Sequence, residues 1–275
     1  MVQKLVLNKS EYYISPQIKQ ELDKGKDKVL NYDQDRFYIV DGNEGLGKST
    51  LALQLACYVD PTFTVENVVF SGEQLEQKIR TLPPHSAIVF DEAFNGLSSK
   101  GALSKENKRM IKLLMECRQK NMFFFIVLPS FFMLEKYVAI FRSRALFHVF
   151  ESRKYNNRRF YTAYNRVNKK RLYLLGKSLL DYSKPRVSFT HQFFKKVPKQ
   201  IDYKAYLKKK HDSFMNVDKL DDQESKQTKQ RNYLIKLLID KHDYSQQKIS
   251  DYLDSVGCPL ERSVISRNIA KLCIV

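Results

Sequence analysis

Residues 42–50 read Gly-Asn-Glu-Gly-Leu-Gly-Lys-Ser-Thr, and this stretch decides the fold of the chain. It matches G-x-x-x-x-G-K-[ST], the pattern of a glycine-rich loop that cradles phosphates at the start of a helix. An apolar run at residues 37–40 predicts a buried strand before the loop, and residues 49–58 predict a helix after it. This context favours a phosphate site over the alternative, a glycine-rich turn with a chance lysine.

The loop residues have distinct predicted roles in holding a nucleoside triphosphate. The glycines let the backbone curl around a phosphate and turn its N–H groups inward. Lys48 is predicted to reach the β- and γ-phosphates, and Ser49 to hold Mg²⁺ through its hydroxyl. The predicted nucleotide-binding set is Gly42, Asn43, Glu44, Gly45, Leu46, Gly47, Lys48, Ser49 and Thr50.

A second motif follows at residues 86–92, Ser-Ala-Ile-Val-Phe-Asp-Glu, where an apolar run ends in two carboxylates. This is the Walker B pattern. Asp91 is predicted to hold the Mg²⁺ shell, and Glu92 to polarise the attacking water as a general base. The two motifs together predict Mg²⁺-dependent hydrolysis, with ATP as the expected substrate and GTP left open.

Two arginines complete the predicted catalytic set of Lys48, Glu92, Arg142 and Arg144. Arg142 and Arg144 follow the helix predicted at residues 132–141, a position that suits an arginine finger acting on a neighbouring subunit. The alternative is a positively charged helix end. The expectation of a homo-oligomer rests on the arginine finger, and Ser130 is a weaker candidate for sensing the γ-phosphate.

Strand and helix patterns alternate over residues 37–150, which predicts an α/β fold with a mostly parallel sheet covered on both faces. A strand is expected between the loop-bearing strand and the acidic strand. The predicted strands are residues 37–40, 65–70, 87–90, 123–128 and 146–150, and the helices are 49–58, 72–80, 105–119 and 132–141.

The net charge of +18 is concentrated in one window. Residues 151–210 carry 18 Lys and Arg against Glu151, Asp181 and Asp202, and eleven Tyr and Phe lie among them. Cations neutralise backbone phosphates and aromatic rings stack on bases, so the window predicts nucleic-acid contact. The alternative is a lysine-rich solvated face. Residues 158–164 and 171–175 predict a basic β-hairpin whose expected phosphate contacts are Arg158, Arg159, Lys169, Lys170 and Arg171.

The chain is expected to have four parts. They are a P-loop ATPase core with an N-terminal extension (1–150), the basic extension (151–210), a linker (211–230) and a small helical domain (231–275). In the last part, residues 231–241, 246–253 and 262–272 predict three helices, and the third carries Arg262, Ser263, Ser266, Arg267 and Asn268. This order predicts a helix-turn-helix that binds DNA, or alternatively a protein-interaction module.

Four cysteines without metal-site spacing predict reduced thiols in a cytoplasmic protein. The N-terminal residues lack the apolar region of a signal peptide, and no apolar run is long enough to span a bilayer. We therefore expect no membrane partner.

The loop at 42–50, the pair Asp91-Glu92 and residues 116–130 resemble the additional-strand, RecA/AAA-like P-loop ATPases. Within them the chain looks most like the zonular occludens toxin-like and HerA/FtsK-type branch, although Pro129-Ser130 stands where that branch often has Gln. Many members serve viruses and mobile elements as DNA pumps or in packaging. The segment at 141–144, Phe-Arg-Ser-Arg, is also similar to the arginine motif of AAA+ replication initiators and clamp loaders.

These resemblances imply two functions. The first is an oligomeric, DNA-stimulated ATPase motor of a virus or mobile element, which translocates or packages DNA. The second is a DNA-binding replication initiator or ATP-dependent switch that uses the C-terminal helix-turn-helix. A third hypothesis is a nucleotide-regulated scaffold whose basic segment binds an acidic protein.

Overall fold

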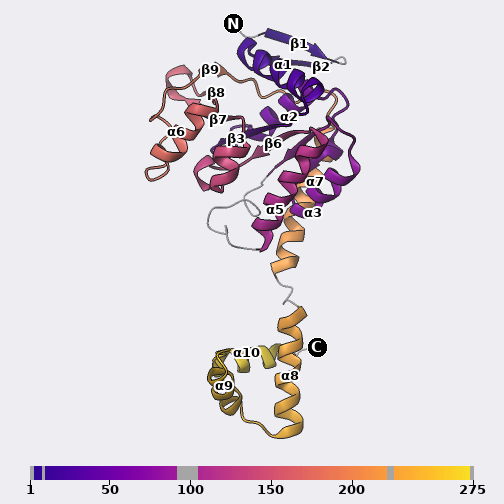
Figure 1. The fold of residues 1–275 in the computed structure, drawn as a ribbon, viewed down its shortest axis with the longest axis vertical. Coiled ribbons are helices and arrows are strands. Elements are labelled where there is room, and N and C mark those ends of the chain that lie inside the picture. Colours follow the sequence, from indigo (N-terminus) through magenta and orange to yellow (C-terminus); the bar gives the residue numbers. More distant parts are fainter. Residues whose placement is uncertain (1–2, 8–9, 92–104, 222–225, 273–275) are drawn as a thin grey trace. The chain divides into compact units, whose positions relative to one another are not determined.

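The computed structural model describes residues 3–7, 10–91, 105–221 and 226–272, and the chain divides into two units, Met1–Ser213 and Phe214–Val275 (Figure 1). Among the described residues, the first unit holds a seven-stranded sheet in the order β4-β5-β6-β3-β7-β8-β9. The strands are β3 (Arg36–Gly42), β4 (Val68–Val69), β5 (Ala87–Phe90), β6 (Phe123–Val127), β7 (Ala145–Ser152), β8 (Arg158–Tyr164) and β9 (Phe189–Gln192).

The five strands from β4 to β7 are parallel, and β8 and β9 continue the sheet in antiparallel pairing. β6 lies between β3 and β5, so the predicted strand between the loop-bearing and acidic strands is confirmed. The central strands are apolar without alternation because both faces of the sheet are covered: residues 37–40 are all buried. The predicted mixed α/β fold with a mostly parallel sheet is confirmed.

Helices pack on both faces of the sheet. The face that buries Tyr38 and Val40 also buries apolar residues of α1 (Pro16–Asn31), α2 (Lys48–Val59) and the start of α7 (Tyr203–Asp221). The opposite face, with Phe37 and Ile39, packs against α3 (Gly72–Thr81), α5 (Lys105–Glu116) and α6 (Arg166–Gly176). The 3₁₀ turn η4 (Phe131–Met133) and the π-helical turn η5 (Tyr137–Arg142) replace the single helix predicted at 132–141.

The predicted basic hairpin is wrong in its second strand. Residues 166–176 form α6, and β8 pairs instead with β7 and β9, with Ser152 opposite Arg158 at the β7–β8 turn. The helix forms because the Asn165 side chain accepts a 2.9 Å hydrogen bond from the Asn168 backbone N–H, capping the first turn. Leu172 and Tyr173 then share one buried helix face, where a strand would send them to opposite sides.

The boundary between the two units falls within α7, which runs on to Asp221, so residues 211–221 of the predicted linker are helical. The second unit continues with α8 (Lys226–His242), α9 (Gln246–Ser255) and α10 (Arg262–Leu272), close to the predicted helices. Its core is formed by Ile235, Ile249 and Ile265. Three leucines of α8, Leu234, Leu237 and Leu238, are exposed, and Leu234 is 63% exposed.

A two-stranded hairpin, β1 (Gln3–Leu7) and β2 (Ser10–Ile14), precedes α1. α1 begins where the Ser15 side chain accepts from the Ile18 N–H, with Pro16 in the first turn. Among the described residues, no helix combines the length and the apolar character needed to cross a bilayer.

Candidate functional site

The loop between β3 and α2 has the backbone of a phosphate cradle. Gly42, Gly45 and Gly47 have φ angles of 133°, 74° and 95°, in the region that side-chain-bearing residues rarely adopt. Lys48 is the first residue of α2, so the positive end of the helix dipole faces the loop. The local structure therefore has the strand–loop–helix form that the motif predicts.

Lys48 lies over its own loop. Its Nζ donates a 2.9 Å hydrogen bond to the Asn43 carbonyl, which holds the ammonium where phosphate oxygens would enter. Burial lowers the pKa of Lys48, while the nearby carboxylates of Asp91 and Asp41 act in the opposite direction. The Asn43 carbonyl thus holds the Lys48 side chain at the loop, and a phosphate oxygen can replace this carbonyl as the acceptor.

Ser49 and Asp91 come together from the two separate motifs. The Ser49 hydroxyl donates to Asp91 Oδ1 at 3.2 Å, and Asp91 directly follows β5 with only 1% of its surface exposed. A hydroxyl and a carboxylate are hard oxygen ligands of the kind that Mg²⁺ prefers. The arrangement fits the predicted metal site.

Two residues that the sequence did not indicate also contact Asp91. The Tyr206 hydroxyl donates to Asp91 Oδ2 at 2.5 Å, and Lys210 Nζ lies 3.6 Å from the same oxygen. Burial, followed by the charge of Asp91, raises the pKa of Tyr206, so this hydroxyl keeps its proton. Both residues lie on α7, whose contact with the Walker B strand has no local signal in the sequence.

A second buried carboxylate lies at the end of β3, one residue before the loop. Asp41 accepts from the Phe131 N–H at 2.7 Å and from the Tyr182 hydroxyl, and its Oδ1 lies 2.9 Å from His148 Nδ1. The Tyr182 ring stacks on His148 with centroids 3.8 Å apart. Ser130, the predicted sensor, is 3.3 Å from the same Tyr182 hydroxyl.

The sequence patterns did not predict this cluster around Asp41, although one signal for it was present. A carboxylate that ends an apolar strand must find hydrogen-bond donors, because burying it alone is costly. The donors to Asp41 come from β7, from the turn after β6 and from the chain after α6. No local sequence pattern indicates them.

The predicted arginine fingers do not lie at the phosphate loop. Arg142 forms a partly buried ion pair with Asp35 and donates to the Leu114 carbonyl at 2.8 Å. Asp35 precedes β3 and the loop follows it, so the seven residues of β3 separate the two by roughly 20 Å at about 3.3 Å per residue. Arg142 is therefore paired within its own fold, and its action on a neighbouring subunit stays a prediction.

Arg144 lies at the same end of the sheet as Arg142. Its backbone N–H donates to the Phe37 carbonyl, and its Nε is 3.4 Å from Glu21 Oε1 at the surface. It does not contact the loop of its own chain. Glu92, the predicted general base, lies outside the described residues.

The basic segment packs directly against the phosphate loop. A Cβ placed on Gly47 would lie 2.9 Å from Phe193 Cε1 and 3.3 Å from Lys195 Cγ. The buried Gln54 side chain of α2 donates to the carbonyls of Phe194 and Lys196 at 3.0 and 2.6 Å. We call residues 193–196 the strap.

Lys169 is the exception among the basic residues expected to contact nucleic acid. It is fully buried, and its Nζ donates to the carbonyls of Ala139 and Ile140 at the end of η5. Burial lowers its pKa to about 7. Lys169 is therefore a helix-capping residue, which removes it from the expected phosphate contacts.

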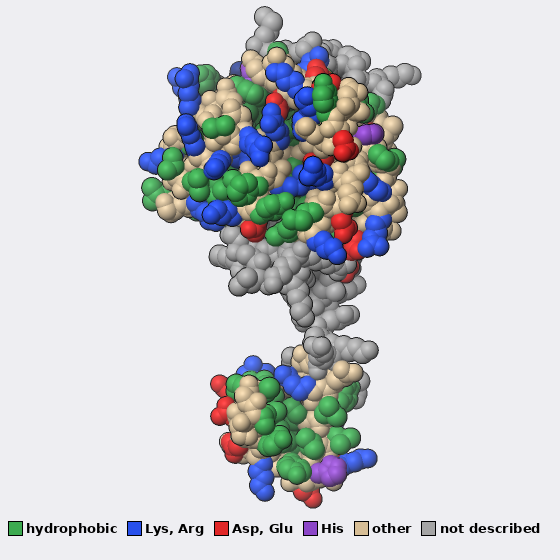
Figure 2. Space-filling view, viewed as in Figure 1, with side chains coloured by type: hydrophobic (Ala, Val, Ile, Leu, Met, Phe, Trp, Pro, Cys, Tyr) green, Lys and Arg blue, Asp and Glu red, His purple; other side chains and the backbone are tan. Residues whose placement is uncertain are grey.

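In the second unit, one face of α10 carries polar and cationic side chains. Arg262, Ser263, Ser266 and Arg267 are all exposed, while Asn268 is partly buried with its Nδ2 3.4 Å from Asn232 Oδ1. The spacing of the exposed residues places them on one side of the helix. Figure 2 shows that hydrophobic side chains also gather on the visible face of this unit.

Comparison with protein families gives one match. The family model described as Novel STAND NTPase 3 matches residues 22–174, which cover the sheet from β3 to β8, the phosphate loop and Asp91. This match confirms the predicted P-loop NTPase class and NTP hydrolysis as the activity. No curated relative matched the sequence.

Two solved structures are similar to part of the chain. The N-terminal domain of zonular occludens toxin from Neisseria meningitidis shares 15% identity over 58% of this chain and 94% of that chain, with a TM-score of 0.40. The genome packaging NTPase B204 from Sulfolobus turreted icosahedral virus 2, in complex with ATP-γS, shares 13% identity over 58% of this chain and 97% of that chain, with a TM-score of 0.35. With TM-scores this low, neither likeness adds to the conclusion from the family model.

Proposed function

The chain belongs to the Novel STAND NTPase 3 family, and we propose that it hydrolyses ATP with Mg²⁺ to drive movement along nucleic acid, as a DNA translocation or packaging motor. The observation that carries the proposal is the packing of the basic segment on the phosphate loop at Gly47. Positive charge that suits a nucleic-acid backbone therefore lies beside the NTPase centre.

The residues of the loop fit a bound Mg²⁺–nucleotide. Lys48 would exchange its bond to the Asn43 carbonyl for phosphate oxygens, and Ser49 and Asp91 would hold the metal. Mg²⁺ neutralises the charge that develops on the transferred phosphoryl group. Glu92, next to Asp91 in the chain, is proposed as the base that orients water.

Among the described residues, no group of three or more His, Cys, Asp and Glu side chains is placed to hold a metal. Mg²⁺ in NTPases needs no such cage, because it keeps several waters and takes other ligands from the phosphates. The Ser49–Asp91 pair is therefore sufficient for the proposed site.

The test measures ATP hydrolysis by the full chain with no nucleic acid, with single-stranded DNA and with double-stranded DNA. The motor requires stimulation by DNA and ATP-dependent displacement of a protein block from a DNA track. Lys48→Ala is the control and should abolish ATP binding in a calorimetric titration. An ATP hydrolysis rate that neither single-stranded nor double-stranded DNA changes would refute the motor.

A homo-oligomer is part of the motor proposal. Arg144 is exposed at the end of the strands opposite the loop, from which it can face a neighbouring subunit. Light scattering with and without a non-hydrolysable ATP analogue measures assembly. Arg144→Ala should then lower the hydrolysis rate without weakening nucleotide binding.

The polar face of α10 favours a second candidate, a DNA-binding initiator or ATP-dependent switch. A separate three-helix unit that presents Arg262 and Arg267 on one helix face suits insertion into a major groove. In the full chain, Arg262→Gln with Arg267→Gln should then abolish a site-specific DNA footprint. A motor without this function gives no such footprint.

A further inference from the structure

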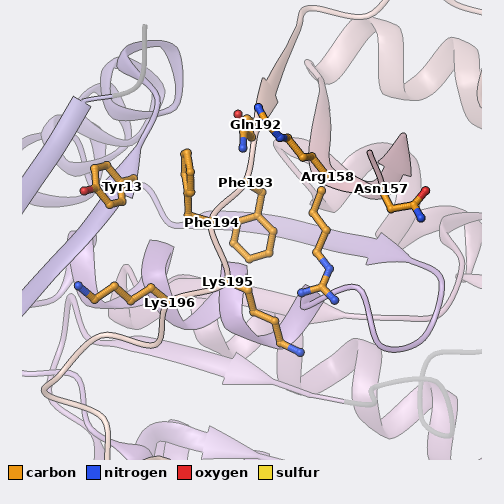
Figure 3. Close-up of a pocket in the computed structure, with 9 residues that line it drawn as sticks. Tyr13, Asn157, Arg158, Gln192, Phe193, Phe194, Lys195 and Lys196 are labelled. Carbon is orange, nitrogen blue, oxygen red and sulfur yellow. The ribbon is translucent and has the colours of Figure 1, made fainter. Parts of the chain in front are cut away.

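A pocket of about 440 Å³ lies beside the phosphate loop, a volume within the range of roughly 300–1,000 Å³ usual for ligand sites (Figure 3). Its walls come from the end of β2, the β7–β8 turn with the start of β8, and the strap after β9. Segments distant in sequence therefore meet in one concave surface.

An aromatic pair forms one side of the pocket. The rings of Tyr13 and Phe194 have centroids 5.0 Å apart, and each residue keeps 36% of its surface exposed. Phe193 beside them is buried and fills the floor toward Gly47. An exposed ring that is held in place by a second ring offers a face on which a planar group can stack.

Four cations surround this pair: Arg158, Arg159, Lys195 and Lys196. Within the described parts of the chain, none of the four forms an ion pair, and no carboxylate lines the pocket. Uncompensated positive charge around a concave aromatic surface suits a ligand with both bases and phosphates.

We propose that this pocket binds a segment of single-stranded nucleic acid, with a base on the Tyr13–Phe194 pair and backbone phosphates on the four cations. The inference rests on the proposed function, to which it adds the place and strandedness of the nucleic acid. Only unpaired bases expose the faces that stacking requires. The base of the bound nucleotide is a poorer occupant, because its phosphates sit at Lys48 and would leave the four cations without partners.

The strap connects this pocket to the NTPase centre. Lys195 lines the pocket and lies so near Gly47 that a Cβ there would be 3.3 Å from Lys195 Cγ, while the carbonyls of Phe194 and Lys196 accept hydrogen bonds from Gln54 on α2. A nucleic-acid strand held by the strap therefore acts on the first turn of α2, which carries Lys48 and Ser49. Binding in the pocket is the route by which nucleic acid alters hydrolysis.

The experiment measures fluorescence anisotropy of a labelled 20-nucleotide oligo-dT with the full chain over a range of salt concentrations. Phe194→Ala should weaken binding roughly 5- to 150-fold, the range for loss of one stacked base. The pair Arg158→Gln and Lys195→Gln should lower the salt slope by about 1.4, at about 0.7 per phosphate contact.

Two controls match these variants. Lys184→Gln with Arg186→Gln removes two exposed cations of the same basic segment outside the pocket, and Tyr32→Ala removes an aromatic residue that is 55% exposed elsewhere. Circular dichroism confirms that each variant is folded. Both controls should retain the affinity of the unaltered chain to within about twofold, below the range for one stacked base.

The outcomes separate this inference from the proposed function. Equal loss in pocket and control variants would overturn the inference alone, since binding would then be spread over the surface. Retained oligonucleotide binding with weakened binding of a fluorescent ATP analogue would assign the pocket to the nucleotide base, which also overturns it. Failure of the unaltered chain to bind any oligonucleotide would overturn both proposals.

Discussion

Asp41 and Asp91 are two buried carboxylates at the carboxyl ends of β3 and β5 in the same sheet. They differ in their hydrogen-bond partners. Each accepts a hydrogen bond from a tyrosine far along the chain, Tyr182 for Asp41 and Tyr206 for Asp91. Asp41 is otherwise enclosed by the Phe131 N–H and His148, whereas Asp91 faces the Ser49 hydroxyl of the phosphate loop.

The difference teaches that burial does not separate a structural carboxylate from a predicted metal ligand, because the two are 0% and 1% exposed. The partners separate them. Donors from the protein satisfy Asp41 on every side, so it holds β3, β7 and the turn after β6 together. Asp91 meets the Ser49 hydroxyl, which is itself a predicted metal ligand, and this pair is the one proposed to hold Mg²⁺.

The largest expected effect is on hydrolysis. Asp91→Asn should lower the rate by two to three orders of magnitude, because several kcal/mol of metal-dependent stabilisation are lost. Steady-state phosphate release measures this, with the unfolding midpoint as a check that the fold is retained. If Asp41→Asn lowers the rate as much while remaining equally stable, the proposed division of roles is wrong.

The next effect is on stability. Asp41→Asn should lower the free energy of unfolding by about 2–3 kcal/mol, since hydrogen bonds to a charged group are lost in the interior. Urea unfolding of both variants measures this. Asp91→Asn should cost less, and a reversal of the order would contradict the comparison.

A smaller effect concerns the stability at alkaline pH. It tests the feature that the two sites share, a tyrosine that donates to the aspartate. Burial, followed by the neighbouring aspartate, raises the pKa of Tyr182 and Tyr206 above 10.0. Above pH 10 the unfolded chain therefore loses protons that the folded chain keeps, and stability falls as the pH rises. Each Tyr→Phe variant should reduce this fall by about 1 kcal/mol between pH 9 and 11, measured by urea unfolding.

The smallest effect distinguishes the tyrosines. Tyr206→Phe removes a donor that competes with the metal for Asp91, so the Mg²⁺ concentration for half-maximal nucleotide binding should fall by roughly threefold. Fluorescence titration of a nucleotide analogue measures it. Tyr182→Phe is the matched control and should leave that concentration unchanged.

The sequence predicted the parts of the molecule whose signals are local. The loop at 42–50 and the strand before Asp91 were found because spacing and apolar runs are written in consecutive residues. The contact of Tyr206 with Asp91 spans 115 residues and depends on the path of α7, which no local pattern encodes.

The wrong strand at residues 171–175 has the same origin. Leu172 and Tyr173 fitted a strand by composition, and only the Asn165 cap and the apolar face beneath α6 made the segment helical. Tertiary packing overrode the local preference there. The pairing of Arg142 with Asp35 has no local signal either, because the two residues are 107 positions apart.

Gly42 shows how closely the catalytic motif is tied to its scaffold. A Cβ at this position would lie 2.1 Å from the Val149 carbonyl of β7, at a φ of 133°. A saturation screen for growth or activity would therefore mark Gly42 as intolerant and suggest a nucleotide contact, when the clash is with a neighbouring strand. Anyone transplanting this loop into another protein must bring a matching opening in the adjacent strand with it.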